Sequence, residues 1–197
     1  MTSRPFAALG RGDQWDGVRV VVAGFDADGY AAADNLLFLG ADVTALDESV
    51  TPGQVERAEL LETLGARVHL EEGATATLPE HVDVVIATHP CSPTTPLLAQ
   101  AAARGVAVWG DLELAWRLRD EERPAPWLAL TGANGKTRTV QMLAAILAAA
   151  GLRCSVAGQG ARPIVEVVMD PEHVDVLAVA ATSTQLHYCD SMAAESA

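Results

Sequence analysis

Short runs of consecutive apolar residues alternate along most of the chain with longer stretches in which apolar residues recur at helical spacing. In the first part of the chain, the runs that we predict to be strands lie at residues 18–23, 43–46, 67–70, 82–87 and 106–109. The stretches that we predict to be helices run from Gly29 to about Leu39 and over residues 54–64, 97–104 and 112–119. Strands that alternate with helices at this spacing are typical of an α/β fold with a parallel sheet.

A charged, proline-rich segment at residues 119–126 follows these elements and has the composition of an interdomain linker. Beyond it, the pattern predicts strands at 127–131, 153–156 and 174–180 and helices at 135–150 and 164–169. We therefore predict a Rossmann-like, parallel-sheet domain over residues 1–120, a linker over 121–126 and a P-loop α/β domain over 127–197. The second domain, with about 70 residues, is expected to be truncated to about half the usual size of a nucleotide-binding domain.

The most informative local pattern is the stretch 128–139, in which a predicted strand ends at Thr131-Gly132 and a predicted helix opens at Gly135-Lys136-Thr137. Backbone N–H groups of such a turn and the helix dipole converge on a phosphate. Lys136 would reach the outer phosphates, and the Thr137 hydroxyl would ligate Mg²⁺. The usual P-loop has four residues between its glycines, whereas two stand here. The alternative is a tight turn that happens to carry a lysine.

An earlier glycine turn, Gly24 to Gly29, lies between a predicted strand and a helix, and Asp47 ends the next strand about 20 positions on, as in dinucleotide-binding folds. Asp26, however, stands where the fingerprint needs its second glycine, and Asp26 and Asp28 would repel a pyrophosphate. A Rossmann-type NAD-binding protein is therefore disfavoured, and a purely structural turn remains an alternative. The proline-rich loop 88–96 follows the next strand, where open parallel sheets bind ligands; His89 there is a candidate contact or a solvated surface residue.

The composition of the chain limits the classes of molecule that it can bind and the cellular compartment in which it works. The formal net charge of −13 disfavours nucleic acid and anionic membranes, although local donors can still hold a nucleotide. No apolar run reaches the ~18 residues of a membrane span. The segment 1–12 lacks the basic-then-apolar layout of a secretion signal. The three cysteines Cys91, Cys154 and Cys189 are scattered, which indicates reduced thiols in a cytoplasmic protein.

The shortened loop Thr-Gly-x-Asn-Gly-Lys-Thr at 131–137 resembles the Mur ligase family, the ATP-dependent amide ligases of peptidoglycan synthesis. The turn 24–29, the segment Trp109–Leu114, Gly158-Gln159 and the segment 182–186 extend the resemblance along the chain, which is most similar to the members that add D-glutamate. In that family ATP phosphorylates a carboxylate, and an amine then attacks the acyl phosphate. The resemblance implies two ligands for this chain, ATP with Mg²⁺ and a UDP-N-acetylmuramoyl-alanine-type substrate.

The resemblance also implies functional residues. Lys136 would be catalytic, and Thr137 would bind the metal. The residues implied to bind ATP are Gly132, Ala133, Asn134, Gly135, Lys136, Thr137 and Arg138. The residues implied to bind the UDP substrate are Gly24, Phe25, Asp26, Ala27, Asp28, Asp47, Gln159, Thr182, Ser183 and Gln185.

The chain departs from the family in four places. Arg138 interrupts a run of threonines, Ala180 replaces a metal-binding glutamate, and Gln159 and Thr184 replace an asparagine and an aromatic residue. The chain also ends before the family's later metal ligands and its C-terminal, glutamate-binding domain. Asp175 and Asp190 are candidate substitutes for the missing carboxylate, but neither is favoured. These departures leave a ligase and a non-catalytic nucleotide- or UDP-muramyl-peptide-binding scaffold both open. We expect that a second copy or another protein covers the uncovered face of the central sheet, or else that the second unit is mobile.

Overall fold

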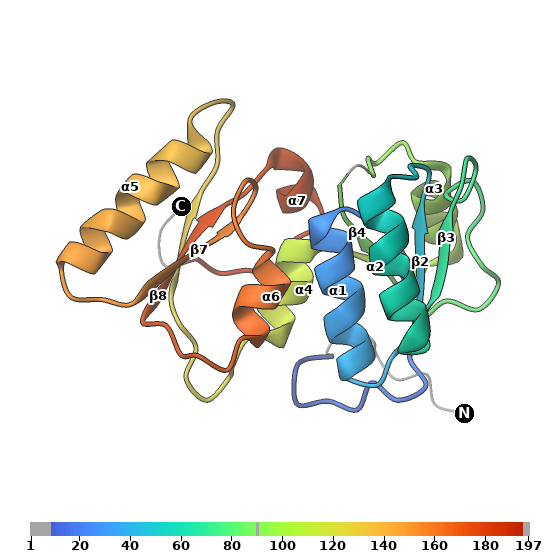
Figure 1. Ribbon diagram of the computed structural model, residues 1–197, viewed down its shortest axis with the longest axis horizontal. Helices are drawn as coiled ribbons and strands as arrows, with labels where there is room; N and C mark the ends of the chain where they lie inside the picture. The colour runs from blue at the N-terminus through green and yellow to red at the C-terminus, as the bar shows by residue number, and fades with distance from the viewer. Residues whose placement is uncertain (1–8, 90, 195–197) are drawn as a thin grey trace. The chain divides into compact units, whose positions relative to one another are not determined.

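Two parallel sheets organise residues 9–89 and 91–194, the part of the chain that the computed structural model describes (Figure 1). The chain divides into two units, Met1–Asp111 and Leu112–Ala197, and each sheet belongs to one of them. The predicted α/β class with parallel sheets is therefore confirmed. Most of the N-terminal segment that we expect to lack a secretion signal, residues 1–8, lies outside the described residues.

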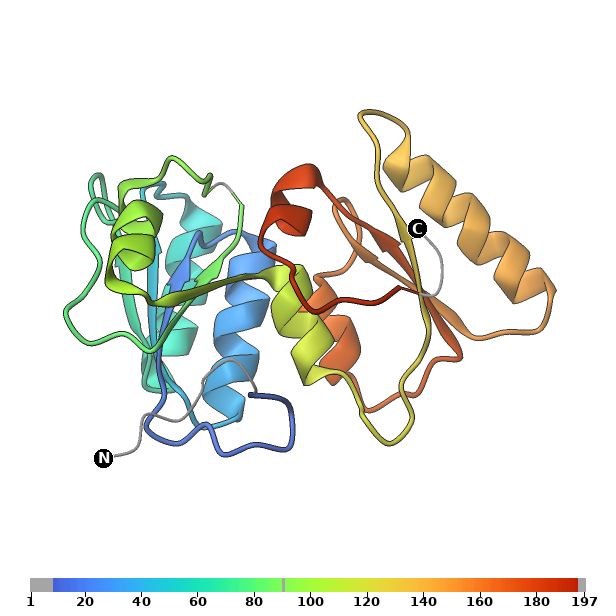
Figure 2. The same ribbon diagram turned by 180° about the vertical axis from the view of Figure 1, so that it is seen from behind.

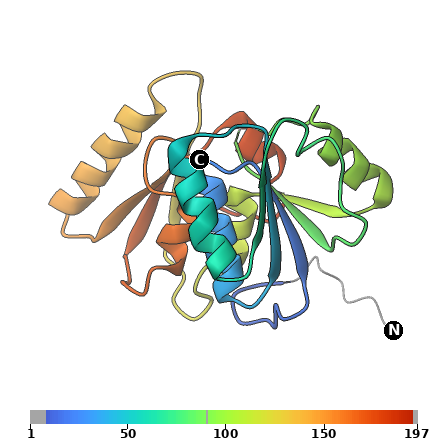
Figure 3. The same cartoon turned by 45° about the vertical axis from the view of Figure 1, so that its right-hand side comes forward.

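The sheet of the first unit is five strands wide within the described residues, in the order β3-β2-β1-β4-β5. Its strands are β1 (Arg19–Ala23), β2 (Asp42–Asp47), β3 (Arg67–Leu70), β4 (Val84–Ala87) and β5 (Ala107–Gly110). Its helices are α1 (Ala27–Phe38), α2 (Pro52–Thr63) and α3 (Pro96–Arg104). The chain winds outward from β1 in one direction and from β4 in the other, so a crevice is expected where the two directions part. Figure 3 shows α1 and α2 side by side on one face of this sheet.

The local sequence explains where these elements begin and end. The residues of β4 are buried and apolar, as expected for a central strand that is covered on both faces. The Asp26 side chain caps α1, and Thr51 and Gln54 form a reciprocal capping box at the start of α2. Gly105 ends α3 in the left-handed conformation that glycine adopts without steric cost.

The sheet of the second unit has the order β6-β8-β7 within the described residues. Its strands are β6 (Trp127–Leu130), β7 (Cys154–Gly158) and β8 (Val176–Ala180). The helices of this part of the chain are α4 (Asp111–Leu118), α5 (Lys136–Ala149), α6 (Ile164–Met169) and α7 (Ser183–His187). Helix α5 packs against β7 and β8, and α6 packs against β7. Figure 2, seen from behind, shows α5 alongside the strands of this unit.

The predicted elements agree with the structure within two residues at most ends, but two differences stand out. Helix α7 was not predicted, because five residues are too few to show a helical period. Residues 112–118 of α4 are grouped with the second unit, not with the first as their position before the linker suggests. The Trp116 ring stacks edge to face on Trp127 with centroids 5.0 Å apart. Glu113 accepts hydrogen bonds from Ser191, which also holds α4 within that unit.

None of the helices in the described part of the chain combines the length and the apolar character needed to cross a membrane.

Candidate functional sites

The loop between β6 and α5 forms a shallow hollow at the carboxyl end of the second sheet. Gly135, the residue before the first helical residue, has a φ of +82°, a left-handed conformation that favours glycine. This conformation starts α5 directly after the turn, so that the first N–H groups of the helix face the hollow. The hollow has a volume of about 400 Å³. Its lining residues are Ala133, Asn134, Gly135, Lys136, Thr137, Arg138 and Gln159.

Lys136 folds back across this loop. Its Nζ atom donates a hydrogen bond of 2.8 Å to the carbonyl oxygen of Gly132. The ammonium of this lining residue is therefore held at the backbone of the loop itself. Arg138, which is exposed, is the other charged residue in the lining of the hollow. The predicted ATP-binding residues other than Gly132 thus surround one hollow, and Gly132 is tied to it through Lys136.

Close backbone packing brings the end of β7 to the same hollow. A Cβ atom on Gly158 would lie 2.3 Å from the carbonyl oxygen of Ala180, so only glycine fits there. The N–H of Gln159 donates to that carbonyl at 3.0 Å. At Gly160, a Cβ would lie 3.0 Å from the Thr137 hydroxyl oxygen. Gln159, which the resemblance assigns to the UDP substrate, therefore lies beside the residues that it assigns to ATP.

The residues that could hold Mg²⁺ are few. Ala180 and Ala181, at the carboxyl end of β8, are 0% and 1% exposed and offer no carboxylate. Mg²⁺ prefers several hard oxygen ligands in octahedral geometry. Among the described residues, no group of three or more histidine, cysteine, aspartate or glutamate side chains could hold a metal ion. Apart from the Thr137 hydroxyl, the donor set around the loop does not fit a metal held by the protein.

The suggestion that Asp175 replaces the missing carboxylate is wrong. Asp175 precedes β8, whereas the loop lies at the carboxyl end of the sheet, one strand length away. Its carboxylate accepts a hydrogen bond of 2.8 Å from the Arg153 N–H and pairs with the Arg153 guanidinium at 3.3 Å. These bonds hold the pKa of Asp175 below its ordinary value. The other suggestion, Asp190, lies beyond α7 and is exposed.

Thr182 and Gln185 form a capping box at the start of α7. The Thr182 hydroxyl accepts from the Gln185 N–H at 3.1 Å, and the Gln185 side-chain carbonyl accepts from the Thr182 N–H at 2.9 Å. Ser183 is the first residue of this helix and is exposed. Two of the three residues that are predicted to contact the substrate in this segment, Thr182 and Gln185, therefore hydrogen-bond to each other.

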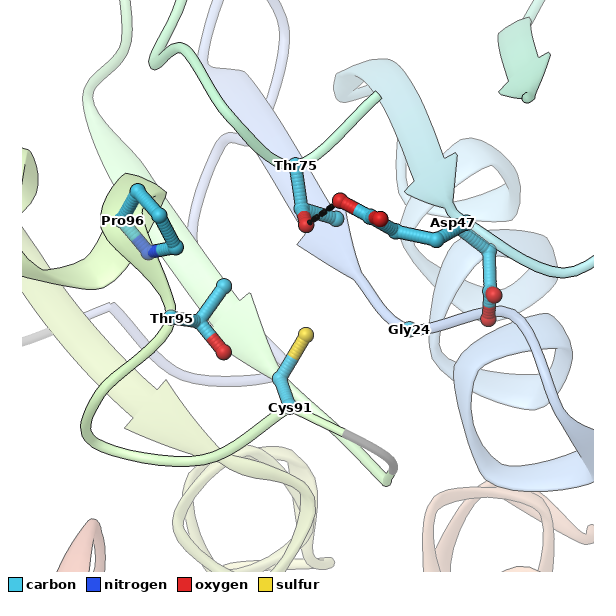
Figure 4. Close-up of a pocket in the computed structure, with 7 residues that line it drawn as sticks. Gly24, Asp47, Thr75, Cys91, Thr95 and Pro96 are labelled. Atoms are coloured by element: carbon cyan, nitrogen blue, oxygen red, sulfur yellow. Dashed lines mark hydrogen bonds between the residues drawn. The ribbon is translucent and has the colours of Figure 1, made fainter. Parts of the chain in front are cut away.

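In the first unit, a cavity of about 260 Å³ opens at the carboxyl ends of the central strands, where the winding direction changes (Figure 4). Its lining residues are Gly24, Asp47, Glu48, Thr75, Cys91, Thr95 and Pro96. This is the place at which the sequence predicts a ligand site, and two of the predicted substrate residues, Gly24 and Asp47, take part in it. The loop 88–96 contributes Cys91, Thr95 and Pro96.

Asp47 is a buried carboxylate whose oxygens are already hydrogen-bonded by its own chain. One oxygen accepts from the Phe25 N–H at 2.6 Å, and the other accepts from the N–H and the hydroxyl of Ser49 at 2.8 and 2.6 Å. The carboxylate thus fastens the glycine turn to the end of β2. Glu48 beside it accepts a hydrogen bond of 2.5 Å from the Thr75 hydroxyl, which lowers the pKa of Glu48.

Asp26 fills the anion position at the start of α1. Its Oδ1 atom accepts from the N–H groups of Asp28 and Gly29, at 3.0 and 3.1 Å. In a dinucleotide fold these helix N-terminal N–H groups are the ones that receive the pyrophosphate. The carboxylate therefore opposes a dinucleotide at this turn. The neighbouring predicted residues differ in access, because the Phe25 ring is buried and Ala27 is exposed.

Negative charge gathers around the same turn. Burial, followed by the nearby charges of Asp111 and Asp26, raises the pKa of Asp28 to about 7. His89 Nδ1 lies 3.6 Å from Asp26 Oδ2 and is the positive partner at this turn when it is protonated. His89 is thus a neighbour of the helix cap; it does not line the cavity. Close to neutral pH the turn changes its charge, and this change affects any anion that approaches it.

Sequence reasoning did not assign Glu48, Thr75, Cys91, Thr95 and Pro96 to a site. The position of Glu48 next to Asp47 could have indicated that it belongs to the site. The loop after β4, which contains Cys91, Thr95 and Pro96, could have done so for these three residues. Thr75 had no signal, because only the fold brings the loop after β3 to the ends of β1 and β2. Burial raises the pKa of the Cys91 thiol to about 11, so it is a poor nucleophile at neutral pH.

Known proteins are similar to this chain over most of its length. The chain is 48% identical over 183 residues to the UDP-N-acetylmuramoylalanine–D-glutamate ligase of Streptomyces avermitilis, covering 93% of this chain and 38% of that ligase. It is 45% identical over 186 residues to the ligase of the same name from Streptomyces coelicolor, covering 93% and 39%. No protein-family model matches the sequence. The chain thus spans about two fifths of the length of these relatives.

One solved structure from the comparison is the UDP-N-acetylmuramate:L-alanyl-gamma-D-glutamyl-meso-diaminopimelate ligase of Neisseria meningitides. It is 22% identical to this chain, covers 83% of it with 52% of its own length, and superposes with a TM-score of 0.49.

Proposed function

We propose that this chain, a homologue of the UDP-N-acetylmuramoylalanine–D-glutamate ligases, binds the phosphate chain of ATP at the loop Gly132–Arg138. The observation that carries the proposal is the hollow of about 400 Å³, whose lining combines the start of α5 with two cations, Lys136 and Arg138. Helix N–H groups and cations together favour a phosphate over neutral ligands. ATP would supply the phosphoryl group of a ligation reaction.

Lys136 makes this proposal easy to test, because it is the only lysine in the sequence. An amine-reactive reagent followed by mass spectrometry should modify Lys136 and the N-terminal amine alone. We expect ATP to protect Lys136 and to leave the N-terminal amine reactive. Equal modification of Lys136 with and without saturating ATP would count against the site.

The Lys136→Ala variant gives a second measurement of the same site. We expect it to weaken ATP binding by about tenfold or more in titration calorimetry, since a charge-assisted hydrogen bond contributes about 1.5–3 kcal/mol. Arg123→Ala removes a cation before β6, at the opposite end of that strand, and should leave the affinity unchanged. An unchanged affinity in Lys136→Ala would contradict the assignment.

A UDP-N-acetylmuramoyl-alanine-type substrate is the second ligand that we propose, at the carboxyl edge of the first sheet. The cavity there supports it, because Gly24 and Asp47 lie at the point where parallel sheets bind ligands. The Asp26 cap opposes it at the helix N-terminus, where a diphosphate would compete with a carboxylate of the protein. Calorimetry with this substrate should show binding, and Asp26→Gly should strengthen it.

A nucleotide-binding protein without ligase turnover is the competing function. Ala180 favours it, because a buried methyl group stands at the strand end nearest the loop and cannot ligate Mg²⁺. Phosphate release in a mixture of the chain, ATP, Mg²⁺, UDP-N-acetylmuramoyl-alanine and D-glutamate separates the two functions. Release that depends on D-glutamate supports a ligase, and ATP binding without release supports the binding protein.

We also propose that another polypeptide, either a second copy or a different protein, covers the outer face of α5 in the cytoplasm. Met142 and Ile146 are 60% and 65% exposed on that helix. Within the described residues, β6 pairs on one side only, with β8, and leaves its other edge open. Apolar faces and open strand edges of this kind are the surfaces that proteins cover.

A further inference from the structure

The phosphate loop has the hydroxyl that P-loop proteins use to bind a metal, but the neighbouring strand lacks the carboxylate that completes such a site. In P-loop proteins, Mg²⁺ is held by the hydroxyl of the loop Ser or Thr and by an acidic residue on a second strand. Strand β8 pairs directly with β6, and the register places Ala180 beside Leu130, the last residue of β6. The residues that would supply the carboxylate at this strand end are therefore Ala180 and Ala181, which are both alanines.

The backbone at this strand end is also occupied by contacts within the protein. The carbonyl of Ala180 accepts from the Gln159 N–H at 3.0 Å, and the N–H of Ala181 donates to the Leu130 carbonyl at 2.9 Å. Gly158 packs against the same carbonyl so closely that no side chain fits between them. The backbone groups at this strand end are therefore engaged by the protein itself.

The charges around the hollow suit an anion without a metal. Its lining holds two cations, Lys136 and Arg138, and no acidic side chain, although the whole chain has a formal net charge of −13. Arg138 is the third residue of α5, and helical side chains lean toward the N-terminus of their helix. Among the described residues, its guanidinium has no hydrogen bond or ion pair. It is therefore available to a phosphate.

We infer that this chain binds a nucleoside triphosphate in its metal-free form, with the Arg138 guanidinium as counter-charge in the place of Mg²⁺. The inference rests on the proposed ATP site and specifies the ionic form of the ligand. Free ATP has about two more negative charges than its Mg²⁺ complex, and Lys136 and Arg138 supply two positive charges. The planar guanidinium can donate two parallel hydrogen bonds to phosphate oxygens, as arginine does at other phosphate sites.

Calorimetric titration of the full chain with ATP, at constant ionic strength, tests the ionic form. We expect ATP in EDTA to bind at least as tightly as ATP in excess Mg²⁺. Binding that is more than tenfold weaker in EDTA would overturn the inference and leave the proposed ATP site standing. Absence of binding in both buffers would overturn the site and the inference together. Protection of Lys136 from the amine reagent, measured in both buffers, gives an independent readout of the same difference.

Arg138→Thr tests the counter-charge. The side chain is exposed, so the variant should fold, and far-ultraviolet circular dichroism checks this. We expect Arg138→Thr to weaken binding in EDTA by about tenfold, with a smaller loss in Mg²⁺. Arg138→Lys should recover part of the loss, and Arg123→Thr should bind as the wild type does. An unchanged affinity of Arg138→Thr in EDTA would overturn the role of Arg138.

Discussion

The turn after β1 needs glycine at two positions, because an added Cβ atom would collide with the backbone. A Cβ atom on Gly29 would lie 2.0 Å from the carbonyl oxygen of Gly24, and a Cβ on Gly24 would lie 2.6 Å from the carbonyl of His89. Both contacts are with backbone, which cannot move aside as a flexible side chain can. The two glycines therefore allow three chain segments to meet where the cavity opens, and this role does not depend on any ligand.

Gly29→Ala is expected to lower the free energy of unfolding by about 2 kcal/mol or more, because the new methyl group forces the backbone apart. Urea denaturation followed by circular dichroism measures this change. Gly53→Ala is the matched control, since a Cβ at Gly53 meets no atom within 4 Å and lies near the start of α2. Equal stability of the two variants would contradict the packing argument.

Asp28 links the stability of the first unit to pH. Its pKa is about 7 in the folded state and 3.8 ordinarily, so the folded state holds the proton more tightly. The stability that this proton contributes is fully present below about pH 4 and is lost as the pH rises through 7. We expect Asp28→Asn to raise the melting temperature at pH 8 by several degrees and to reduce the decline between pH 4 and 7.

Thermal melts at a series of pH values measure this effect. Asp16→Asn, which removes an exposed acid of the same unit, should keep the wild-type pH dependence. A decline between pH 4 and 7 that is the same in Asp28→Asn and in the wild type would show that other groups cause it.

At the scale of elements, the ends of the helices are the best-specified features. Thr51 and Gln54 hold each other at the start of α2: the Gln54 N–H donates to the Thr51 hydroxyl at 3.3 Å, and the Gln54 side-chain oxygen accepts from the Thr51 N–H at 3.0 Å. The Gln54 amide also donates to the Phe25 carbonyl at 3.3 Å. This cap therefore joins α2 to the glycine turn as well as starting the helix.

Thr51→Ala is expected to cost about 1 kcal/mol of unfolding free energy, as the loss of an N-cap usually does. Thr63→Ala, at the other end of the same helix, removes a hydroxyl that donates only to the Glu59 carbonyl within the helix. That variant should be close to neutral in the same urea titration. A cost at Thr63 as large as that at Thr51 would contradict the capping interpretation.

At the scale of the whole molecule, the second unit leaves apolar surface uncovered. Only Val140 of α5 is buried, although most of this helix is apolar. The small cluster beneath it consists of Val140, Ala178 and Ala180, with Leu143, Cys154 and Val156 at its margin. Alanines form the β8 side of this cluster, and Val140 is its one buried residue on α5. A further surface is expected to stabilise the unit.

We expect the wild-type chain to associate at micromolar concentration in size-exclusion chromatography with light scattering, and Met142→Glu/Ile146→Glu to shift it toward the monomer. Leu60→Glu/Leu64→Glu introduces the same charge on α2 and its C-cap residue, where both leucines are exposed, and should leave the association unchanged. A wild-type monomer whose second unit is protected in hydrogen exchange would contradict the proposed covering of α5.

The sequence by itself determined the class of the fold, the positions of most elements and the anion loop, because each depends on local chemistry. Apolar runs predict buried strands, and Gly135-Lys136 after such a run predicts a phosphate loop. The tertiary structure alone decided which of these features meet. Only the fold places Thr75 at the cavity of the first unit. The Asp26 carboxylate caps α1 at the position that a phosphate would occupy. Asp175 lies at the end of β8 that is opposite to the phosphate loop, too far away to bind a metal there. These outcomes depend on strand order and register, which single-sequence periodicity does not encode.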